Sequence, residues 1–177
     1  MNKIIENAIL THSGDYFSFS DPGVNYIQIE DIAHALSMIC RFNGHVNKFY
    51  SVAEHCVLAS WHVEKGYEYD ALMHDSAEAF IGDIAKPLKM MLPDFKKIEA
   101  SVEEHLFQIF NVSIPLPKEV KEIDMILLAT EQKLLMNNQD SWFHTHGRKP
   151  LDINTIPCWN PGKAKHMFLK RYDELTS

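Results

Sequence analysis

Two histidines and two aspartates stand at positions from which their side chains could share one divalent metal ion. His55 precedes the dipeptide His74-Asp75, and Asp124 follows it. Each falls in a segment whose apolar residues recur at helical spacing. A metal held by imidazole and carboxylate groups activates a bound water near neutral pH and offers a docking point for phosphate oxygens. Zinc, cobalt, manganese and iron(II) all suit this ligand set.

Taken singly, each of these residues has a more ordinary explanation. A lone histidine in a helix is more often a core or surface residue than a ligand, and a chain with ten histidines readily contains a His-Asp dipeptide by chance. The metal interpretation depends on their joint placement. Burying four polar or charged groups among apolar residues is unfavourable unless they are paired or bind a metal.

Acidic residues close to these positions could assist the chemistry. Glu78 lies one helical turn after His74 and could transfer a proton. Asp83 follows a glycine in a turn that ends the helix, so it could act on the substrate or only cap the chain. Glu131 lies on about the same helix face as Asp124, and we expect it to be solvated or to support a ligand, not to bind the metal itself.

The elements that must position these residues are mostly helical. Ser51 and Glu54 have the spacing of a capping box at the start of the helix that carries His55. Residues 17–29 indicate a short hairpin or an ordered loop, and residues 137–157 look irregular. The predicted helices cover residues 31–41, 51–63, 68–80, 93–110, 117–135 and 161–172. This pattern predicts an all-α bundle of about six helices, in a single domain over residues 1–177.

Composition excludes several classes of protein. The 177 residues are 46% apolar, which is enough for a folded core. A net charge of -7 without a dense basic block argues against nucleic-acid binding, and no apolar run is long enough to span a membrane. The amino terminus lacks the apolar core of a secretion signal. Three cysteines without a CxxC pair indicate free thiols in a reducing cytoplasm: Cys40, Cys56 and Cys158.

The histidines and aspartates in this order resemble the metal-binding motif of the HD-domain phosphohydrolases. Within that superfamily, further runs resemble the bacterial 5′-deoxynucleotidases. They are Arg41-Phe42, Val52-Ala53-Glu54-His55, His74-Asp75-Ser76-Ala77-Glu78, Gly82-Asp83 and Pro87-Leu88-Lys89. Residues 29–37, 40–45 and 49–53 are similar to a phage branch that hydrolyses dATP in phages whose DNA carries 2-aminoadenine. The resemblance covers residues 30–135.

The resemblance implies a role for each motif residue. The metal ligands would be His55, His74, Asp75 and Asp124. The catalytic residues would be Glu78, as general acid or base, and Asp83, which would orient water or the leaving group.

The resemblance also implies substrate contacts. Arg41 and Lys89 would neutralise phosphate charge, and Lys86 is an additional candidate, although each lysine taken alone is typical of a solvated surface. Phe42 would lie against the deoxyribose and leave a 2′-hydroxyl without a partner.

Four other histidines are open to two interpretations. His34 and His45 flank Arg41 and could line a pocket or be structural. His144 and His146 could bind adventitious metal, but a surface loop is the favoured interpretation.

Together these observations predict a phosphohydrolase, dependent on zinc, cobalt or manganese, that acts on deoxynucleotides. The expected substrate is dATP, with dADP and dAMP, cleaved to deoxyadenosine and (tri)phosphate so that dATP is depleted for synthesis of modified phage DNA. One alternative is a general 5′-deoxyribonucleotidase for monophosphates, and another is an HD-domain protein that senses nucleotides without catalysis. The resemblance implies a homo-oligomer, a dimer or a hexamer, in the cytoplasm of a bacterial host.

Overall fold

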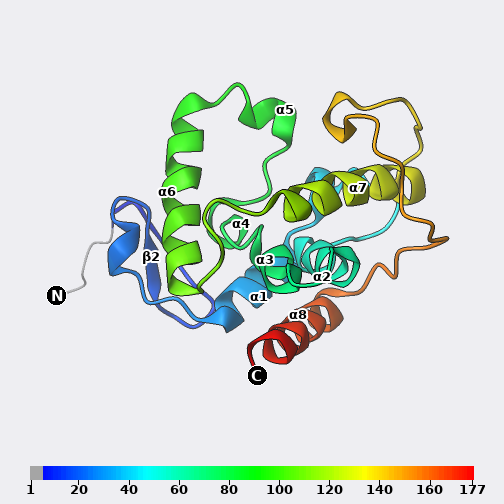
Figure 1. Cartoon of the computed structure of the whole chain (residues 1–177). Helices are drawn as coiled ribbons and strands as arrows, with labels where there is room; N and C mark the ends of the chain where they lie inside the picture. Colours follow the sequence, from blue (N-terminus) through cyan, green and yellow to red (C-terminus); the bar gives the residue numbers. More distant parts are fainter. Residues whose placement is uncertain (1–5) are drawn as a thin grey trace.

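Helices make up most of the backbone of the computed structural model, which describes residues 6–177 (Figure 1). The predicted all-α class is therefore confirmed. The α-helices are α1 (Ile29–Met38), α2 (Val52–His62), α3 (Glu68–Met73), α4 (Glu78–Ile81), α5 (Lys86–Lys89), α6 (Pro93–Ile109), α7 (Lys118–Leu135) and α8 (Pro161–Thr176). The remaining elements are strands β1 (Ala8–Leu10) and β2 (Tyr16–Ser18) and the 3-10 helices η1 (Pro22–Val24), η2 (Arg41–Gly44) and η3 (Phe143–Thr145).

Helix α2 lies among the other helices and contacts α1, α3, α7 and α8 (Figure 1). Its residues from Val52 to Ser60 are all buried, so this length of the helix has no solvent face. A helix of this kind is stable only when its neighbours cover it on every side. Because His55 lies in the first turns of α2, packing from several helices fixes the position of its side chain.

Ser51 caps α2 as predicted, but only half of the capping box forms. The Ser51 hydroxyl oxygen accepts a hydrogen bond from the Glu54 amide over 3.1 Å. The Glu54 carboxylate does not return to the cap. It accepts from the amides of Cys158 and Trp159, over 2.8 and 2.7 Å, and so fixes the chain just before α8 to the buried helix α2.

Replacing Glu54 by alanine is expected to lower the free energy of unfolding by about 3 kcal/mol, because two amides lose a buried acceptor. The measurement is urea unfolding followed by circular dichroism. Glu64→Ala is the matched control, since Glu64 is exposed just beyond α2. Equal unfolding midpoints for the two variants would show that the Glu54 hydrogen bonds contribute little to stability.

Helix α1 ends before the predicted boundary at Arg41. The backbone becomes extended at Ile39, and Cys40 forms an antiparallel bridge with Ser51. The Arg41 amide then donates to the Tyr50 carbonyl oxygen over 2.9 Å. This short pairing, which helical periodicity does not reveal, places Arg41 beside the first turn of α2.

The predicted helix over residues 68–80 is interrupted. Helix α3 ends at Met73, and the Glu78 amide donates to the Asp75 carbonyl oxygen, which makes a tighter turn before α4. Neighbouring residues of a regular helix project about 100° apart. The turn lets His74 Nε2 and Asp75 Oδ2 approach to 3.3 Å.

Of the two alternatives predicted for residues 17–29, an ordered loop follows the strand at the start of this range, and the hairpin lies upstream. Strand β2 begins at Tyr16 and pairs with β1 upstream, with Ile9 opposite Phe17. Phe17 is buried and stacks on Phe80 with ring centroids 4.1 Å apart, so core packing sets the position of this strand. The turn signal after β2 forms η1 instead of a hairpin turn.

None of the helices in the described part of the chain is both long enough and apolar enough to cross a membrane. The thiols of Cys40, Cys56 and Cys158 are free, as predicted, and Cys56 is fully buried in α2. Burial raises the pKa of the Cys56 thiol well above its usual value, so this group is an unreactive part of the core.

Candidate active site

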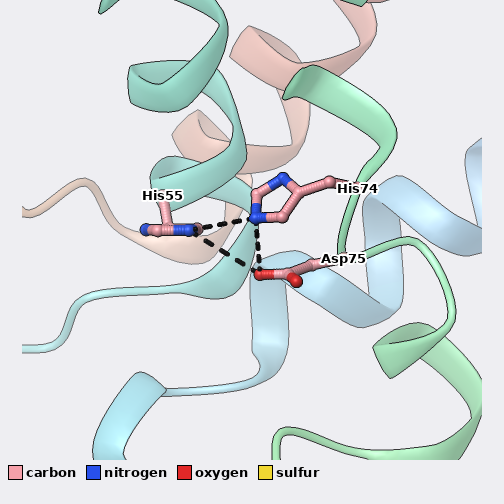
Figure 2. A group of neighbouring side chains, drawn as sticks. All are labelled: His55, His74 and Asp75. Carbon is pink, nitrogen blue, oxygen red and sulfur yellow. Dashed lines mark hydrogen bonds and ion pairs between the residues drawn. The ribbon is translucent and has the colours of Figure 1, made fainter. Parts of the chain in front are cut away.

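His55, His74 and Asp75 bring three potential metal-binding atoms together (Figure 2). The two Nε2 atoms are 3.4 Å apart, and Asp75 Oδ2 lies 3.7 Å from His55 Nε2 and 3.3 Å from His74 Nε2. His55 comes from α2, and the other two residues come from the turn between α3 and α4. Two nitrogens and a carboxylate oxygen at this spacing could hold one metal ion.

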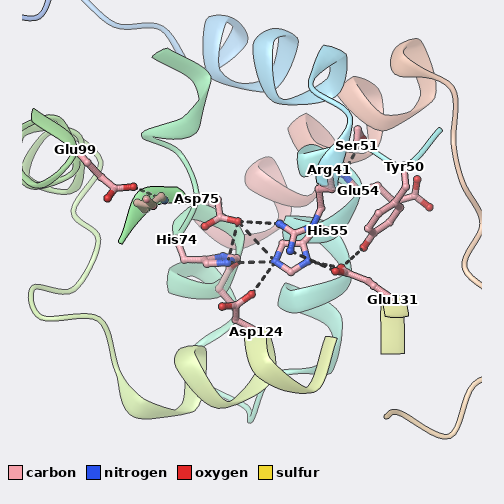
Figure 3. Close-up of polar contacts among 12 residues, drawn as sticks. Arg41, Tyr50, Ser51, Glu54, His55, His74, Asp75, Glu99, Asp124 and Glu131 are labelled. Atoms are coloured by element: carbon pink, nitrogen blue, oxygen red, sulfur yellow. Dashed lines mark hydrogen bonds and ion pairs between the residues drawn. The ribbon is translucent and has the colours of Figure 1, made fainter. Parts of the chain in front are cut away.

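Asp124 joins the cluster from helix α7 (Figure 3). Its Oδ1 atom lies 3.3 Å from His55 Nε2. The structure therefore brings the four residues singled out in the sequence to one place. Burial alone would raise the pKa of Asp124, but its hydrogen bond with His55 holds this pKa well below the usual range.

The other ring nitrogens of the two histidines also have partners. His74 Nδ1 lies 2.8 Å from the Ala71 carbonyl oxygen, and His55 Nδ1 lies 2.6 Å from Glu131 Oε1. Both partners are hydrogen-bond acceptors, so each Nδ1 carries the hydrogen and each Nε2 lone pair is directed at the cluster. The donor set therefore fits a divalent metal, held by His55, His74, Asp75 and Asp124.

The cluster favours positive charge at the point where the ring nitrogens meet. Burial and Arg41 lower the pKa of His55, but Glu131 and Asp124 outweigh them and raise it to about 9. A metal ion bound there would displace a proton from the ring, so metal affinity and proton binding are coupled.

Glu131 is fully buried beneath the cluster and supports it, which is one of the two roles expected from the sequence. Its Oε1 accepts a hydrogen bond from the Tyr50 hydroxyl over 2.8 Å, and its Oε2 lies 3.3 Å from Arg41 Nη2. Burial raises the pKa of Glu131, but Arg41 and His55 outweigh it and lower the pKa below its usual value. An ionised carboxylate thus orients His55 and neutralises part of the charge on Arg41.

Arg41 lies between the cluster and an open cavity. Its Nη1 is 3.4 Å from Asp75 Oδ2, so the guanidinium pairs with carboxylates on two sides. The next residues, Phe42 and Asn43, have φ values of 56° and 53°, a left-handed conformation that is unfavourable for side chains other than glycine. The surrounding fold holds this strain at the edge of the site.

The cavity has a volume of about 810 Å³. Its floor includes Asp75 and Asp124, and its walls contain the predicted phosphate and sugar contacts Arg41, Phe42, Lys86 and Lys89. Lys89 forms an ion pair with Glu99 of α6, which holds the lysine at the cavity lining. A ligand in this space would meet carboxylates and cations together, since Arg41 Nη1 lies 3.4 Å from Asp75 Oδ2.

Glu78 and Asp83 also line the cavity. Gly82 ends α4 with a φ of 79°, as its position in the sequence predicted, and the turn brings Asp83 to the wall. Burial, followed by the charges of Asp75 and Asp83, raises the pKa of Glu78 well above its usual value, and burial also raises the pKa of Asp83. Among the residues the structure describes, Glu78 Oε2 has no hydrogen-bond partner, so a protonated Glu78 is free to donate to a ligand.

The four histidines outside the metal cluster that the sequence singled out differ in whether they reach the cavity. His45 and His144 line the cavity, whereas His146 is exposed. His34 stacks on His12, with ring centroids 3.6 Å apart, and is not part of the cavity wall. Both His144 and His146 lie in a surface segment, as expected, and this segment packs against α7 so that the half-buried His144 reaches the cavity.

Two parts of the site could not be found from the sequence pattern. Tyr50 hydrogen-bonds Glu131, and a tyrosine just before a helix cap gives no signal of that contact. The irregular stretch after α7 supplies Ser141, Trp142 and Phe143 to the cavity wall. Two adjacent aromatic residues in a polar loop, Trp142 and Phe143, were the one feature of the sequence that indicated a role for this stretch in the site.

The fold and the cluster define a helical protein with an HD-type set of histidines and aspartates. The chain belongs to the family of the uncharacterized protein YfdR of Escherichia coli, with which it is 39% identical over 170 residues, 95% of each chain. No family model matches the chain.

The relatives with a stated activity match a shorter part of the chain. The chain is 32% identical over 102 residues to a 5′-deoxynucleotidase of Vibrio vulnificus, and 30% identical over 102 residues to a 5′-deoxynucleotidase of Vibrio atlanticus. Each match covers 54% of this chain and 41% of the Vibrio protein.

Proposed function

We propose that the protein is a metal-dependent phosphohydrolase that cleaves deoxynucleotides between the phosphate and the 5′ oxygen. The observation that carries this proposal is the convergence of His55, His74, Asp75 and Asp124 beside a cavity whose lining also contains Arg41, Lys86 and Lys89. The names of the Vibrio relatives support the substrate class. A volume of about 810 Å³ is in the range of small-molecule sites and is ample for a nucleotide.

The four cluster residues would hold zinc, cobalt or manganese, which when bound would supply an activated water and polarise a phosphoryl oxygen. Arg41 would bind phosphate oxygens through two parallel N–H groups, and Lys86 and Lys89 would add further positive charge.

The chain's other polar residues would handle the leaving group. Protonated Glu78 would donate its proton to the 5′ oxygen, and Asp83 would orient the water or this oxygen. Phe42 would lie against the deoxyribose and leave a 2′-hydroxyl without a hydrogen-bond partner, which would favour deoxynucleotides.

The finer proposal is that dATP is the preferred substrate, cleaved to deoxyadenosine and triphosphate, in the service of phage DNA that carries a modified base. Three cations around the cavity support binding of a triphosphate. The second candidate is a general 5′-deoxyribonucleotidase for monophosphates, which the similarity to the Vibrio proteins favours. Both candidates break the bond between the phosphate and the 5′ oxygen. The two activities therefore differ in the number of phosphates on the substrate and in its base.

A panel of substrates tests both candidates. Purified protein is incubated with zinc, cobalt or manganese and with the mono-, di- and triphosphates of deoxyadenosine, the other deoxynucleosides and adenosine. We expect release of the nucleoside from deoxynucleotides, with ribonucleotides slower. Triphosphate released from dATP supports the first candidate, and phosphate released only from monophosphates supports the second. If no nucleoside is released with any of the metals, the protein is not a phosphohydrolase of this class.

A further inference from the structure

The segment of residues 138–148 contributes part of the cavity lining. This segment, coloured yellow to orange, leaves the end of α7 and folds back along that helix (Figure 1). Its side chains Ser141, Trp142, Phe143 and His144 line the cavity. They come from a different element than Arg41, Lys86 and Lys89, the proposed phosphate contacts.

Hydrogen bonds attach the segment to α7 at several points. Gln132 Nε2 donates to the carbonyl oxygens of Asp140 and Asn138, over 2.6 and 3.4 Å. Beyond η3, Arg148 Nη2 lies 2.9 Å from Glu122 Oε2. Because α7 also carries Asp124, the segment has a defined position relative to the cluster.

Trp142 is held by the segment's own turn. The Thr145 hydroxyl, in a buried side chain, donates to the Trp142 carbonyl oxygen over 2.8 Å. The Trp142 ring lies next to the Phe42 ring, with centroids 6.1 Å apart and planes tilted by 58°. Together the two rings make an aromatic wall of the cavity.

The dimensions of this wall limit how a planar ligand can bind. A base stacked between two rings needs about 7 Å between them, since aromatic planes in contact are about 3.5 Å apart. The observed 6.1 Å and the tilt exclude such a sandwich. A base can therefore pack only on the cavity side of one ring. Phe42 is the proposed contact of the sugar, and the indole ring of Trp142 is larger than the phenyl ring of Phe42, so Trp142 is the better contact for the base.

We propose that Trp142 binds the nucleobase and provides the base-dependent part of substrate affinity. This inference rests on the proposed action on deoxynucleotides. Stacking uses the face of the base, so all bases bind, and purines bind more tightly than pyrimidines because they cover more of the indole. Ser141 and His144 on the same wall supply polar groups for the edge of the base.

The test compares substrates with and without a base. For Trp142→Ala, kcat/KM for dAMP is expected to fall about 5- to 100-fold, mostly through KM, because stacking of one base is lost. For 2-deoxyribose 5-phosphate, which lacks a base, kcat/KM is expected to stay at the wild-type value. Trp142→Phe should restore most of the activity on dAMP. Trp61→Ala is the matched control, because Trp61 lies on the outer face of α2 and is 44% exposed.

Each outcome decides the question. Equal losses on both substrates would show that Trp142 only maintains the shape of the cavity, and an unchanged kcat/KM for dAMP would show that the base does not contact it. Calorimetric binding of dAMP and 2-deoxyribose 5-phosphate is measured in parallel. Binding of dAMP that weakens in Trp142→Ala without any turnover by the wild type would support the base contact and overturn the proposed hydrolysis instead. Absence of dAMP binding to the wild type would overturn the base contact.

Discussion

Replacing Asp75 by asparagine is expected to reduce deoxynucleotide hydrolysis about 10³-fold, because the metal's contribution of several kcal/mol to the barrier is lost. Asp75 is the one residue of the cluster that contacts both histidines and Arg41. An amide at this position keeps the shape of the side chain but removes the negative charge that holds the cation. The measurements are kcat/KM on dAMP and dATP and the metal content of the purified protein.

The fold is expected to survive this change. Asp75 lies in a turn with its side chain 21% exposed, and Arg41 keeps its second partner, Glu131. Circular dichroism and the unfolding midpoint should therefore remain close to the wild type. Asp94→Asn, on the exposed start of α6, is the matched control for charge. Full activity in Asp75→Asn would exclude the metal site proposed here.

Replacing Glu78 by glutamine is expected to lower kcat about 10²- to 10⁴-fold with little change in KM, as for loss of a general acid. Burial raises the pKa of Glu78 well above its usual value, which favours the protonated form that a general acid needs. The Glu78 carboxyl loses this proton as the pH rises through its raised pKa. Wild-type activity should therefore decline on the alkaline side.

The pH profile separates this role from a purely structural one. Glutamine cannot lose a proton in this range, so the residual activity of Glu78→Gln should lack the alkaline decline that Glu78 causes. Metal content should match the wild type, because Glu78 is outside the cluster of ligands. A variant that keeps the same alkaline decline at lower activity would show that another group donates the proton.

Much of this site could be predicted because its residues lie on long, regular elements. Helix α2 has a serine cap and mostly apolar residues around its polar ones, and α7 has a clear apolar stripe, so the positions of His55 and Asp124 follow from helical periodicity. Burial of polar residues among apolar ones then indicated that they must share a partner. The structure shows that they meet.

The parts that could not be predicted depend on contacts between distant segments. Helical periodicity does not reveal the break between His74 and Glu78, because the sequence there remains compatible with a helix. The contact of Tyr50 with Glu131 and the position of Trp142 depend on how α7 lies against α2 and on how a loop returns. Such long-range geometry leaves no periodic signal in the sequence.

Helix α7 carries a metal-site aspartate near its middle and, further on, the glutamine that fixes the loop with Trp142. Each residue of a helix turns the chain by about 100° and advances it by about 1.5 Å. Adding or removing one residue between Asp124 and Gln132 would therefore rotate the loop away from the cavity while the floor stayed in place. A change of length in this part of the helix would thus separate the loop from the metal-binding residues, whereas a substitution among Ser141, Trp142, Phe143 and His144 would alter the cavity lining and leave its position unchanged.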